Sequence, residues 1–304
     1  MIFFNKKVNR VLLINKKKGH SSNYTLQKVK NIFKVNKAGH TGTLDPLATG
    51  MLPICFGKST KFSEFLIKSD KKYIVTAKLG EKTPTGDSES LIISKKDVYF
   101  TNIKLKKVIY SFIGKINQIP PMYSAIKYKG IPLYKYARKG INIKLKKRVV
   151  KIYSIFFYRR NSLLYLEISC SKGTYIRSLI NDIGDKLECG AHVIFLHRSE
   201  ISSYPTNKMV SLKYLKYLRK KYSYNIFLKK MFSRFLIPVE NMIDCRKVIH
   251  IDKHSYLKLK QGQIIKSSYK YYRGIIKLIN NVDNVFVGLA YINIYGYIRP
   301  YKVI

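Results

Sequence analysis

The loop from Ala38 to Gly50, AGHTGTLDPLATG, contains the first candidate for chemistry, Asp45. Asp45 is the only carboxylate between Met1 and Ser63, a stretch that also holds twelve Lys and Arg residues, and this field favours its ionised form. Asp followed by Pro46 can simply form the N-cap and first residue of a helix. Alternatively, the glycines let a ligand approach the backbone and the carboxylate does chemistry. The composition of the loop favours the second interpretation.

Two further residues stand out, Arg177 and Tyr73. Arg177 falls in the first turn of a helix predicted to begin at Thr174 as its N-cap, where a cation opposes the helix dipole. An ion pair with Asp45 would compensate it; the alternative is an exposed arginine without a partner. Tyr73 begins an alternating strand and is either an ordinary half-buried strand residue or part of a site.

Other motifs exclude common cofactors. Gly57-Lys58-Ser59 resembles the end of a P-loop, but that motif requires glycine at position 52, which is leucine. The acids at 182, 185 and 188 have the spacing of a solvated helix face, and the four cysteines form no CxxC pair. The sequence predicts reduced cysteines, no metal and no cofactor.

The elements that must position these residues alternate irregularly. A strand over Val11 to Ile14 precedes a helix capped by Ser22 or Asn23, and strands are expected over Tyr73 to Leu79, Gly114 to Ile119, Val149 to Phe157 and Leu163 to Cys170. A basic, helix-prone segment follows Tyr204. This order predicts an α+β fold with a mostly antiparallel mixed central sheet flanked by helices. From about Val248, short predicted strands separated by turns indicate a small all-β module.

The net charge of the chain limits the classes of partner that we expect. The 304 residues include 59 Lys and Arg against 16 Asp and Glu, a net charge of +43. Such a surface attracts polyanions, so nucleic acid is the expected partner, although bias in an AT-rich genome also enriches lysine. No apolar run reaches the ~18 residues that span a bilayer, which predicts a cytoplasmic chain without a membrane partner.

Five stretches together resemble the bacterial tRNA pseudouridine synthase B family. They are AGHTGTLDPLATGMLPICFGKSTKF from Ala38, DKKYIVTAKLG from Asp70, TPTGD from Thr83, QIPPMYSAIKYKGIPLYKYARKG from Gln118 and CSKGTYIRSLINDIGDKLECGAHVIFLHR from Cys170. The resemblance implies a pseudouridine synthase fold over residues 1–245 and a PUA-like RNA-binding domain over 246–304. It also implies isomerisation of uridine 55 in the T loop of tRNA, by a monomer that needs no cofactor.

Matched residue by residue, the resemblance assigns roles. Asp45 falls on the catalytic aspartate, Tyr73 on the tyrosine that stacks on the target base, and Arg177 on the arginine that pairs with the aspartate. The remaining matches are to substrate-binding positions: His40 fills the place of the departed uridine, Tyr175 and Leu196 line the pocket, and Lys16 belongs to the first turn. That turn departs from the family pattern Asp-Lys-Pro-x-Gly, because it reads Asn-Lys-Lys-Lys-Gly from Asn15.

The chemistry and its alternatives remain open at this level. An ionised carboxylate can attack C1′, attack C6 of the ring, or remove the C2′ proton to form a glycal. A non-catalytic tRNA-binding or tRNA-folding chaperone, or a synthase for another RNA uridine, would share the basic surface.

Overall fold

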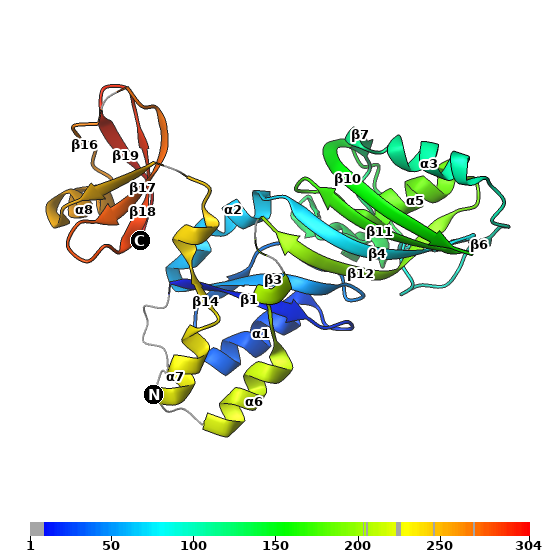
Figure 1. Cartoon of the computed structure of the whole chain (residues 1–304), viewed down its shortest axis with the longest axis horizontal. Helices are drawn as coiled ribbons and strands as arrows, with labels where there is room; N and C mark the ends of the chain where they lie inside the picture. The colour runs from blue at the N-terminus through cyan, green and yellow to red at the C-terminus, as the bar shows by residue number, and fades with distance from the viewer. Residues whose placement is uncertain (1–8, 203, 205, 223–225, 246, 270) are drawn as a thin grey trace.

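The computed structural model describes residues 9–304 except 203, 205, 223–225, 246 and 270. Its main feature is a ten-stranded sheet with the order β13-β1-β3-β12-β4-β11-β10-β7, with β14 paired to β1 and β2 paired to β3 (Figure 1). The strands are β1 (Arg10–Lys16), β2 (Ala38–His40), β3 (Thr49–Phe56), β4 (Lys71–Leu79), β7 (Gly114–Gln118), β10 (Arg148–Arg160), β11 (Leu163–Cys170), β12 (Ala191–Ile201), β13 (Val210–Ser211) and β14 (Leu236–Pro238). All pairs are antiparallel except β1 with β13 and β3 with β12, so the predicted mixed α+β sheet is confirmed.

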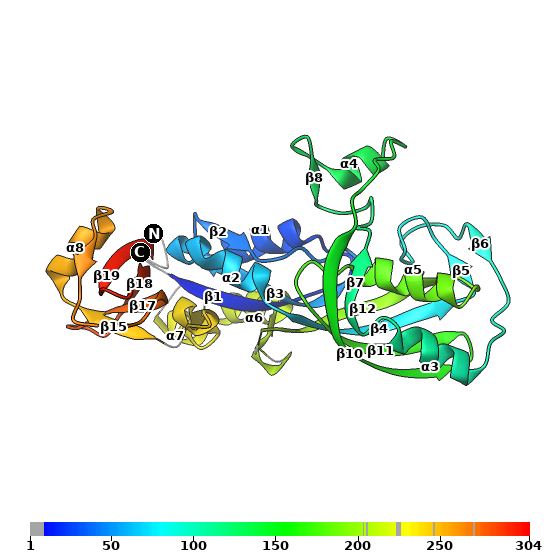
Figure 2. The ribbon, with the colours of Figure 1, turned by 90° about the horizontal axis from the view of Figure 1, so that it is seen from above.

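Helices and short elements connect these strands. The helices are α1 (Ser22–Phe33), α2 (Ser63–Lys68), α3 (Asn102–Tyr110), α4 (Leu133–Ala137), α5 (Ile176–Lys186), α6 (Leu212–Tyr222), α7 (Ile226–Ser233) and α8 (Lys253–Lys260), with 3-10 turns η1 (Gly57–Phe62), η2 (Thr206–Lys208) and η3 (Val239–Met242). Two further pairs of short strands are separate from the main sheet: β5 (Glu81–Lys82) with β6 (Ser94–Lys95), and β8 (Lys127–Tyr128) with β9 (Ile131–Pro132). Figure 2 shows the segment of β8 and α4 projecting from the sheet. Gly130, with a φ of +81°, lies in the turn between β8 and β9. The predicted basic helical segment contains α6 and α7, and residues 223–225 between them lie outside the described residues.

The main apolar core lies on one face of β4, β11 and β12. Val75, Leu166 and Val193 are buried against α5, whose Leu179 and Ile183 are fully buried. Gly184 is required on α5, because a Cβ there would come within 2.2 Å of the Ala191 backbone nitrogen. The helix therefore packs directly on β12, and this contact fixes where its first turn lies.

Both predicted N-caps were wrong. Ser21, not Ser22 or Asn23, caps α1, since its hydroxyl accepts from the Tyr24 amide at 3.0 Å. Helix α5 has Tyr175 at its N-cap with no side-chain cap, while the Thr174 hydroxyl donates to the Ser171 carbonyl. Each error shifts the helix start by one or two residues and leaves the freed hydroxyl for another contact.

The C-terminal domain contains a five-stranded sheet of order β15-β17-β18-β19-β16. Its strands are β15 (Val248–Ile251), β16 (Ile265–Lys266), β17 (Gly274–Asn280), β18 (Phe286–Ile292) and β19 (Tyr297–Val303). The expectation of an all-β module was wrong in one respect, because Asp252 caps helix α8 inside it. The domain is β-rich, as the resemblance implies.

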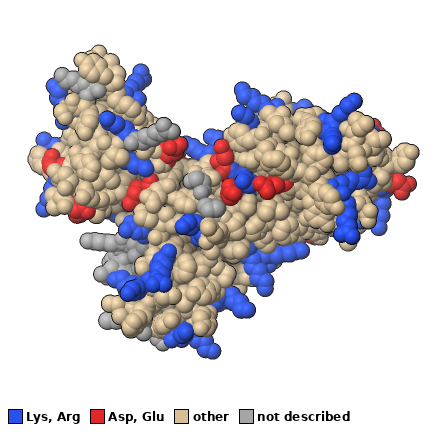
Figure 3. Space-filling model, in the orientation of Figure 1, with Lys and Arg blue, Asp and Glu red and all other residues tan. Residues whose placement is uncertain are grey.

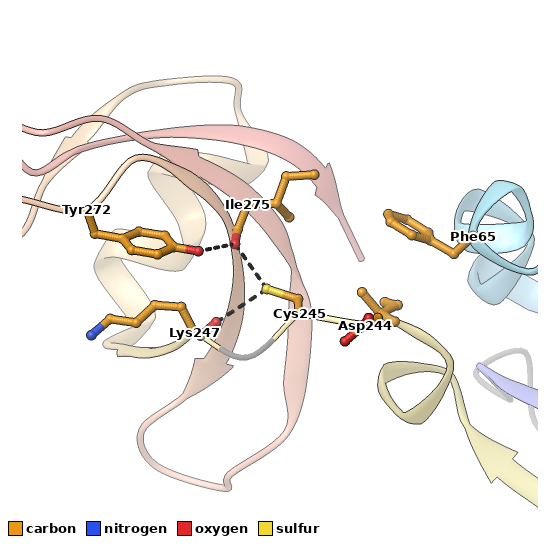
Figure 4. A pocket seen from close by; sticks show the side chains of 7 residues that line it. Phe65, Asp244, Cys245, Lys247, Tyr272 and Ile275 are labelled. Carbon is orange, nitrogen blue, oxygen red and sulfur yellow. Dashed lines mark hydrogen bonds between the residues drawn. The ribbon is translucent and has the colours of Figure 1, made fainter. Parts of the chain in front are cut away.

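This domain docks on η1 and α2. The Phe62 and Phe286 rings lie 5.5 Å apart, and the Tyr301 hydroxyl and the Lys302 ammonium contact the Glu64 carboxylate at 2.8 and 2.6 Å. Figure 4 shows the pocket at this junction, where Phe65 faces Cys245 and Ile275. The domain boundary expected between residues 245 and 246 stays a prediction, and residue 246 lies outside the described residues.

Candidate active site

The Asp45 loop is held rigidly from both sides. The Ser22 hydroxyl accepts from the Leu44 amide at 2.9 Å and donates to the Leu44 carbonyl at 3.0 Å. On the other side, the Gly19 amide donates to the Pro46 carbonyl at 2.9 Å. No helix begins at Asp45, so the N-cap interpretation was wrong; instead the Asp45 carbonyl accepts from the Ala48 amide in a tight turn. The carboxylate is left free for other contacts.

Asp45 and Arg177 form the ion pair that the sequence predicts. Arg177 Nε lies 2.8 Å from Asp45 Oδ2, and Nη2 donates to Oδ1 at 3.0 Å, which is bidentate geometry. The arginine is buried, whereas 33% of the aspartate side chain is exposed. The pair therefore presents its carboxylate, and not its cation, to an approaching ligand.

A second carboxylate, that of Asp87, stabilises the same guanidinium. Its Oδ2 lies 3.4 Å from Arg177 Nη1, and the Thr85 and Tyr123 carbonyls accept from the same side chain at 2.8 Å each. Asp87 is only 2% exposed, and its Oδ1 accepts from the Thr85 hydroxyl at 2.6 Å. The TPTGD stretch contains Asp87, but no role could be predicted for this residue, because nothing local in the sequence shows that it faces α5.

Burial dominates the electrostatics of Asp45. It raises the pKa of this carboxyl, and the Arg177 guanidinium opposes the rise by stabilising the charged form. The expectation that the surrounding basic residues favour the ionised form was wrong in its balance, because burial outweighs them; Lys16 lowers the pKa more weakly than Arg177 does. A carboxylate that is partly desolvated and oriented by a guanidinium is more reactive than one in water.

A pocket of about 480 Å³ brings together three of the predicted residues, Asp45, Arg177 and His40. Burial lowers the pKa of His40, so the ring is neutral, and its Nδ1 is buried without a hydrogen-bond partner among the described residues. The segment around α4 closes the opposite wall. The full lining is Ser21, Ser22, Asn23, His40, Thr43, Leu44, Asp45, Pro46, Thr85, Asp87, Glu89, Tyr123, Ser124, Ala125, Tyr134, Arg138 and Arg177.

Three other predicted residues lie behind this pocket and do not line it. Tyr73 and Leu196 are 8% and 5% exposed and belong to the apolar cluster that also contains Leu44 and Ala48 of the Asp45 loop. Tyr175 is half-buried, and its backbone is held by Gln118, whose side chain donates to its carbonyl at 3.0 Å and accepts from its amide at 2.8 Å. Tyr73 and Leu196 therefore lie beneath the surface, whereas Tyr175 is partly exposed.

Lys16 is placed differently from the expectation of substrate binding. Its side chain is fully buried, and its ammonium donates to the carbonyls of Lys17, His20 and Pro46 at 3.1, 2.7 and 3.2 Å. Burial lowers its pKa to about 8. The ammonium therefore holds the first turn and the Asp45 loop together in place of the missing proline and acid.

Arg198 on β12 was not found from the sequence. Its Nε donates to the Met51 carbonyl at 2.8 Å, and its Nη2 donates to the Gly42 carbonyl at 3.0 Å. These two hydrogen bonds hold the backbone on either side of Asp45 in place. Gly50 is needed beside it, because its φ is +99° and a Cβ would meet the Arg198 carbonyl at 2.4 Å. The feature of the sequence that could have indicated this role is the position of an arginine at the end of an apolar strand.

Among the residues that the structure describes, no group of three or more His, Cys, Asp and Glu could hold a metal ion, and no helix is long and apolar enough to cross a membrane. The acids at 182, 185 and 188 follow the predicted solvated face, where Asp185 and Glu188 pair with Lys82 and Lys104.

The geometry defines an enzyme site that works through an oriented carboxylate in a strongly basic chain. Family models for the TruB family pseudouridylate synthase N-terminal domain, the tRNA pseudouridylate synthase B C-terminal domain and the pseudouridine synthase II TruB C-terminal region match residues 30–176, 177–244 and 248–304. The chain belongs to the TruB family of pseudouridine synthases, as the sequence resemblance implied.

Comparisons with individual proteins support the same family assignment. The chain is 44% identical to tRNA pseudouridine synthase B of Buchnera aphidicola subsp. Acyrthosiphon pisum, covering 100% of this chain and 98% of that protein. It is 42% identical to tRNA pseudouridine synthase B of Escherichia coli O139:H28, covering 98% and 95%. A solved Cbf5-Nop10-Gar1 complex has the same fold, with a TM-score of 0.70 at 22% identity over 94% of this chain and 79% of that chain.

Proposed function

We propose that this pseudouridine synthase converts uridine 55 in the T loop of tRNA to pseudouridine, with Asp45 as the reacting carboxylate. The observation that carries the proposal is the bidentate Asp45–Arg177 pair, with its carboxylate exposed to the pocket. The substrate follows from the relatives, which are named as tRNA pseudouridine synthases. The strongly positive chain suits a tRNA backbone.

The reaction breaks the bond from C1′ to N1 and forms one from C1′ to C5, while C5 loses a proton and N1 gains one. Asp45 starts it by attack on C1′, attack on C6 or removal of the C2′ proton, and its orientation by Arg177 serves all three routes. The chemistry is an internal rearrangement, and the proposal assigns it no cofactor.

The target base must leave its stack, which costs a few kcal/mol. We assign His40 to the space that the base vacates, because its neutral ring lines the pocket beside Asp45. Tyr73 is assigned to stacking on the extruded ring and Leu196 to the pocket lining, because both belong to the apolar cluster directly under the Asp45 loop. Tyr175 is assigned to a lining position at the start of α5.

The proposal treats the enzyme as a monomer that acts on the T-arm stem-loop, in the cytoplasm where tRNA is processed. The C-terminal domain would add affinity. Its contacts to Glu64 tie it to the catalytic domain and leave the Asp45 pocket unobstructed.

The test uses a tRNA transcript carrying tritium at C5 of every uridine, because isomerisation releases that hydrogen to water. We expect one equivalent of tritium per tRNA, and none when uridine 55 is replaced by cytidine. Release that survives the replacement would indicate another target uridine. Tight binding with no release from either transcript would indicate the RNA chaperone.

A further inference from the structure

The main sheet has a second face that the proposed function does not use. On β10, β11, β4 and β12, alternate residues such as Val75, Leu166 and Leu196 face the core under α5. The residues between them point to the other side, where no described helix covers them. We call this side the open face.

Cross-strand pairing arranges the open face in rows. Tyr158 pairs with Tyr165, Tyr165 with Thr76, and Thr76 with Phe195, so one row crosses all four strands. The next row contains Phe156, Glu167, Ile74 and His197 in the same order. At about 4.8 Å per strand, each row is about 14 Å long.

Aromatic rings of these rows are exposed, and four of them stack in two pairs. Phe156, Tyr158, Phe195 and Tyr165 are 69%, 63%, 42% and 38% exposed. Tyr158 and Tyr165 stack at 6.0 Å, and Phe195 and His197 stack at 6.3 Å with only 5° between their planes. Ring faces held open to water on neighbouring strands form a platform for other flat rings.

The platform continues into a strongly basic groove. His197, whose Nδ1 lies 2.8 Å from the Thr49 hydroxyl, lines a groove of about 690 Å³ together with Thr49. Lysines 17, 18, 28, 213 and 216 line the same groove, and none of its lining residues in the described part of the chain is a carboxylate. Figure 3 shows Lys and Arg side chains spread over the face in view, with acidic side chains grouped near its centre.

Two acids on the open face share one cation, since Glu167 and Glu200 lie 3.6 and 3.2 Å from the Lys72 ammonium. The excess of positive charge beside the aromatic rows comes from the lysines of the groove. A ligand that spans the rows and the groove must combine flat rings with negative charge, and single-stranded RNA has both.

We propose that the open face binds a single-stranded RNA segment, with bases stacked on Tyr158, Tyr165 and Phe195 and with phosphates directed to the lysines of the groove. This site lies on the opposite side of the sheet from the core that supports Asp45. It goes beyond the proposed function, because uridine isomerisation does not require it.

The test measures anisotropy of a fluorescent single-stranded RNA that lacks uridine, so that the Asp45 pocket cannot hold its target base. The double variant Tyr158→Leu and Tyr165→Leu keeps apolar area but loses the flat rings, and we expect affinity to fall at least about tenfold. Tyr158→Phe with Tyr165→Phe should stay within about twofold of the wild type. Tyr99→Leu, at a 95% exposed position away from the sheet, is the matched control and should change nothing.

Turnover of a T-arm stem-loop by the double leucine variant should be unchanged, which separates this proposal from the proposed function. Phe195→Leu provides an independent test should the double variant melt early, with an expected loss of about fivefold. Equal affinity of the leucine and wild-type proteins would overturn the proposal. So would a wild-type dimer in analytical ultracentrifugation that the leucine variant abolishes, because the face would then be a protein interface.

Discussion

The Asp45 loop is held by two buried arginines that do different work. Arg177 contacts two carboxylates, those of Asp45 and Asp87, and one of them remains exposed to a pocket. Arg198 donates to the backbone carbonyls of Met51 and Gly42. The first arrangement orients a reactive group, and the second fixes a loop. The partners of a buried guanidinium therefore show whether it orients a reactive group or holds the backbone.

The largest effect is expected for Asp45→Asn. The amide keeps the shape of the side chain but cannot act as a nucleophile or base, so turnover of a T-arm stem-loop should fall more than about 1000-fold. Stem-loop affinity should remain within about threefold, as measured by filter binding. Turnover within about tenfold of the wild type would remove Asp45 from the chemistry.

Asp87→Asn should have the next largest effect. The substitution removes the negative charge that faces Arg177 but keeps an acceptor for the Thr85 hydroxyl. The guanidinium is then less firmly oriented, and no cavity is created. We expect a decrease in kcat of about 10- to 100-fold with little change in KM. A change confined to KM would mean that Asp87 acts on binding. Glu89→Gln, at the same pocket, is the matched control.

Lys16 should set an alkaline limit on activity. Its folded-state pKa of about 8 lies below the ordinary value of 10.5. As pH rises past about 8, the ammonium loses its proton, and the hydrogen bond to the Pro46 carbonyl is no longer assisted by a positive charge. Between these values the unfolded state holds more protons, so the burial penalty of Lys16 is relieved as pH rises. We expect kcat to decline by about tenfold above pH 8, and Lys16→Met to start low and show no such decline. The same alkaline limb in Lys16→Met would assign it to another group.

The smallest effect concerns the domain junction. Hydrogen bonds from Lys302, Lys68 and Tyr301 lower the pKa of Glu64 to about 2, so its stabilisation is present above about pH 4.5 and is lost as pH falls toward 2. Because the contact is partly exposed, Glu64→Gln should cost at most about 1 kcal/mol and lower Tm by at most about 3 °C at pH 7. Turnover should be unaffected. An equal Tm difference at pH 2.5 and pH 7 would contradict the assigned cause.

Local patterns predicted the strands β1, β4, β7, β10 and β11 but not β3 or β12, whose residues do not alternate regularly between buried and exposed. The scarcity of acids and the dipole argument made the Asp45–Arg177 pair one of two interpretations, and the structure confirms the pair. The start of α5 was misjudged for a non-local reason. Gln118 from β7 holds the backbone of Tyr175, so no hydroxyl at Thr174 is needed as a cap. Asp87, Arg198 and the ammonium contacts of Lys16 depend on partners from distant segments. The sequence could indicate these residues but not their roles.

The most direct test of the central claim compares Arg177→Lys with Arg198→Lys in kcat and Tm. Lysine keeps the charge but loses the bidentate fork. We predict that Arg177→Lys lowers kcat at least about 100-fold with a modest change in Tm. Arg198→Lys should lower Tm by about 5 °C, through lost bonds to buried carbonyls, and change kcat less than about tenfold. Equal losses of kcat in both variants would contradict the account, because the two arginines would then serve the reaction alike.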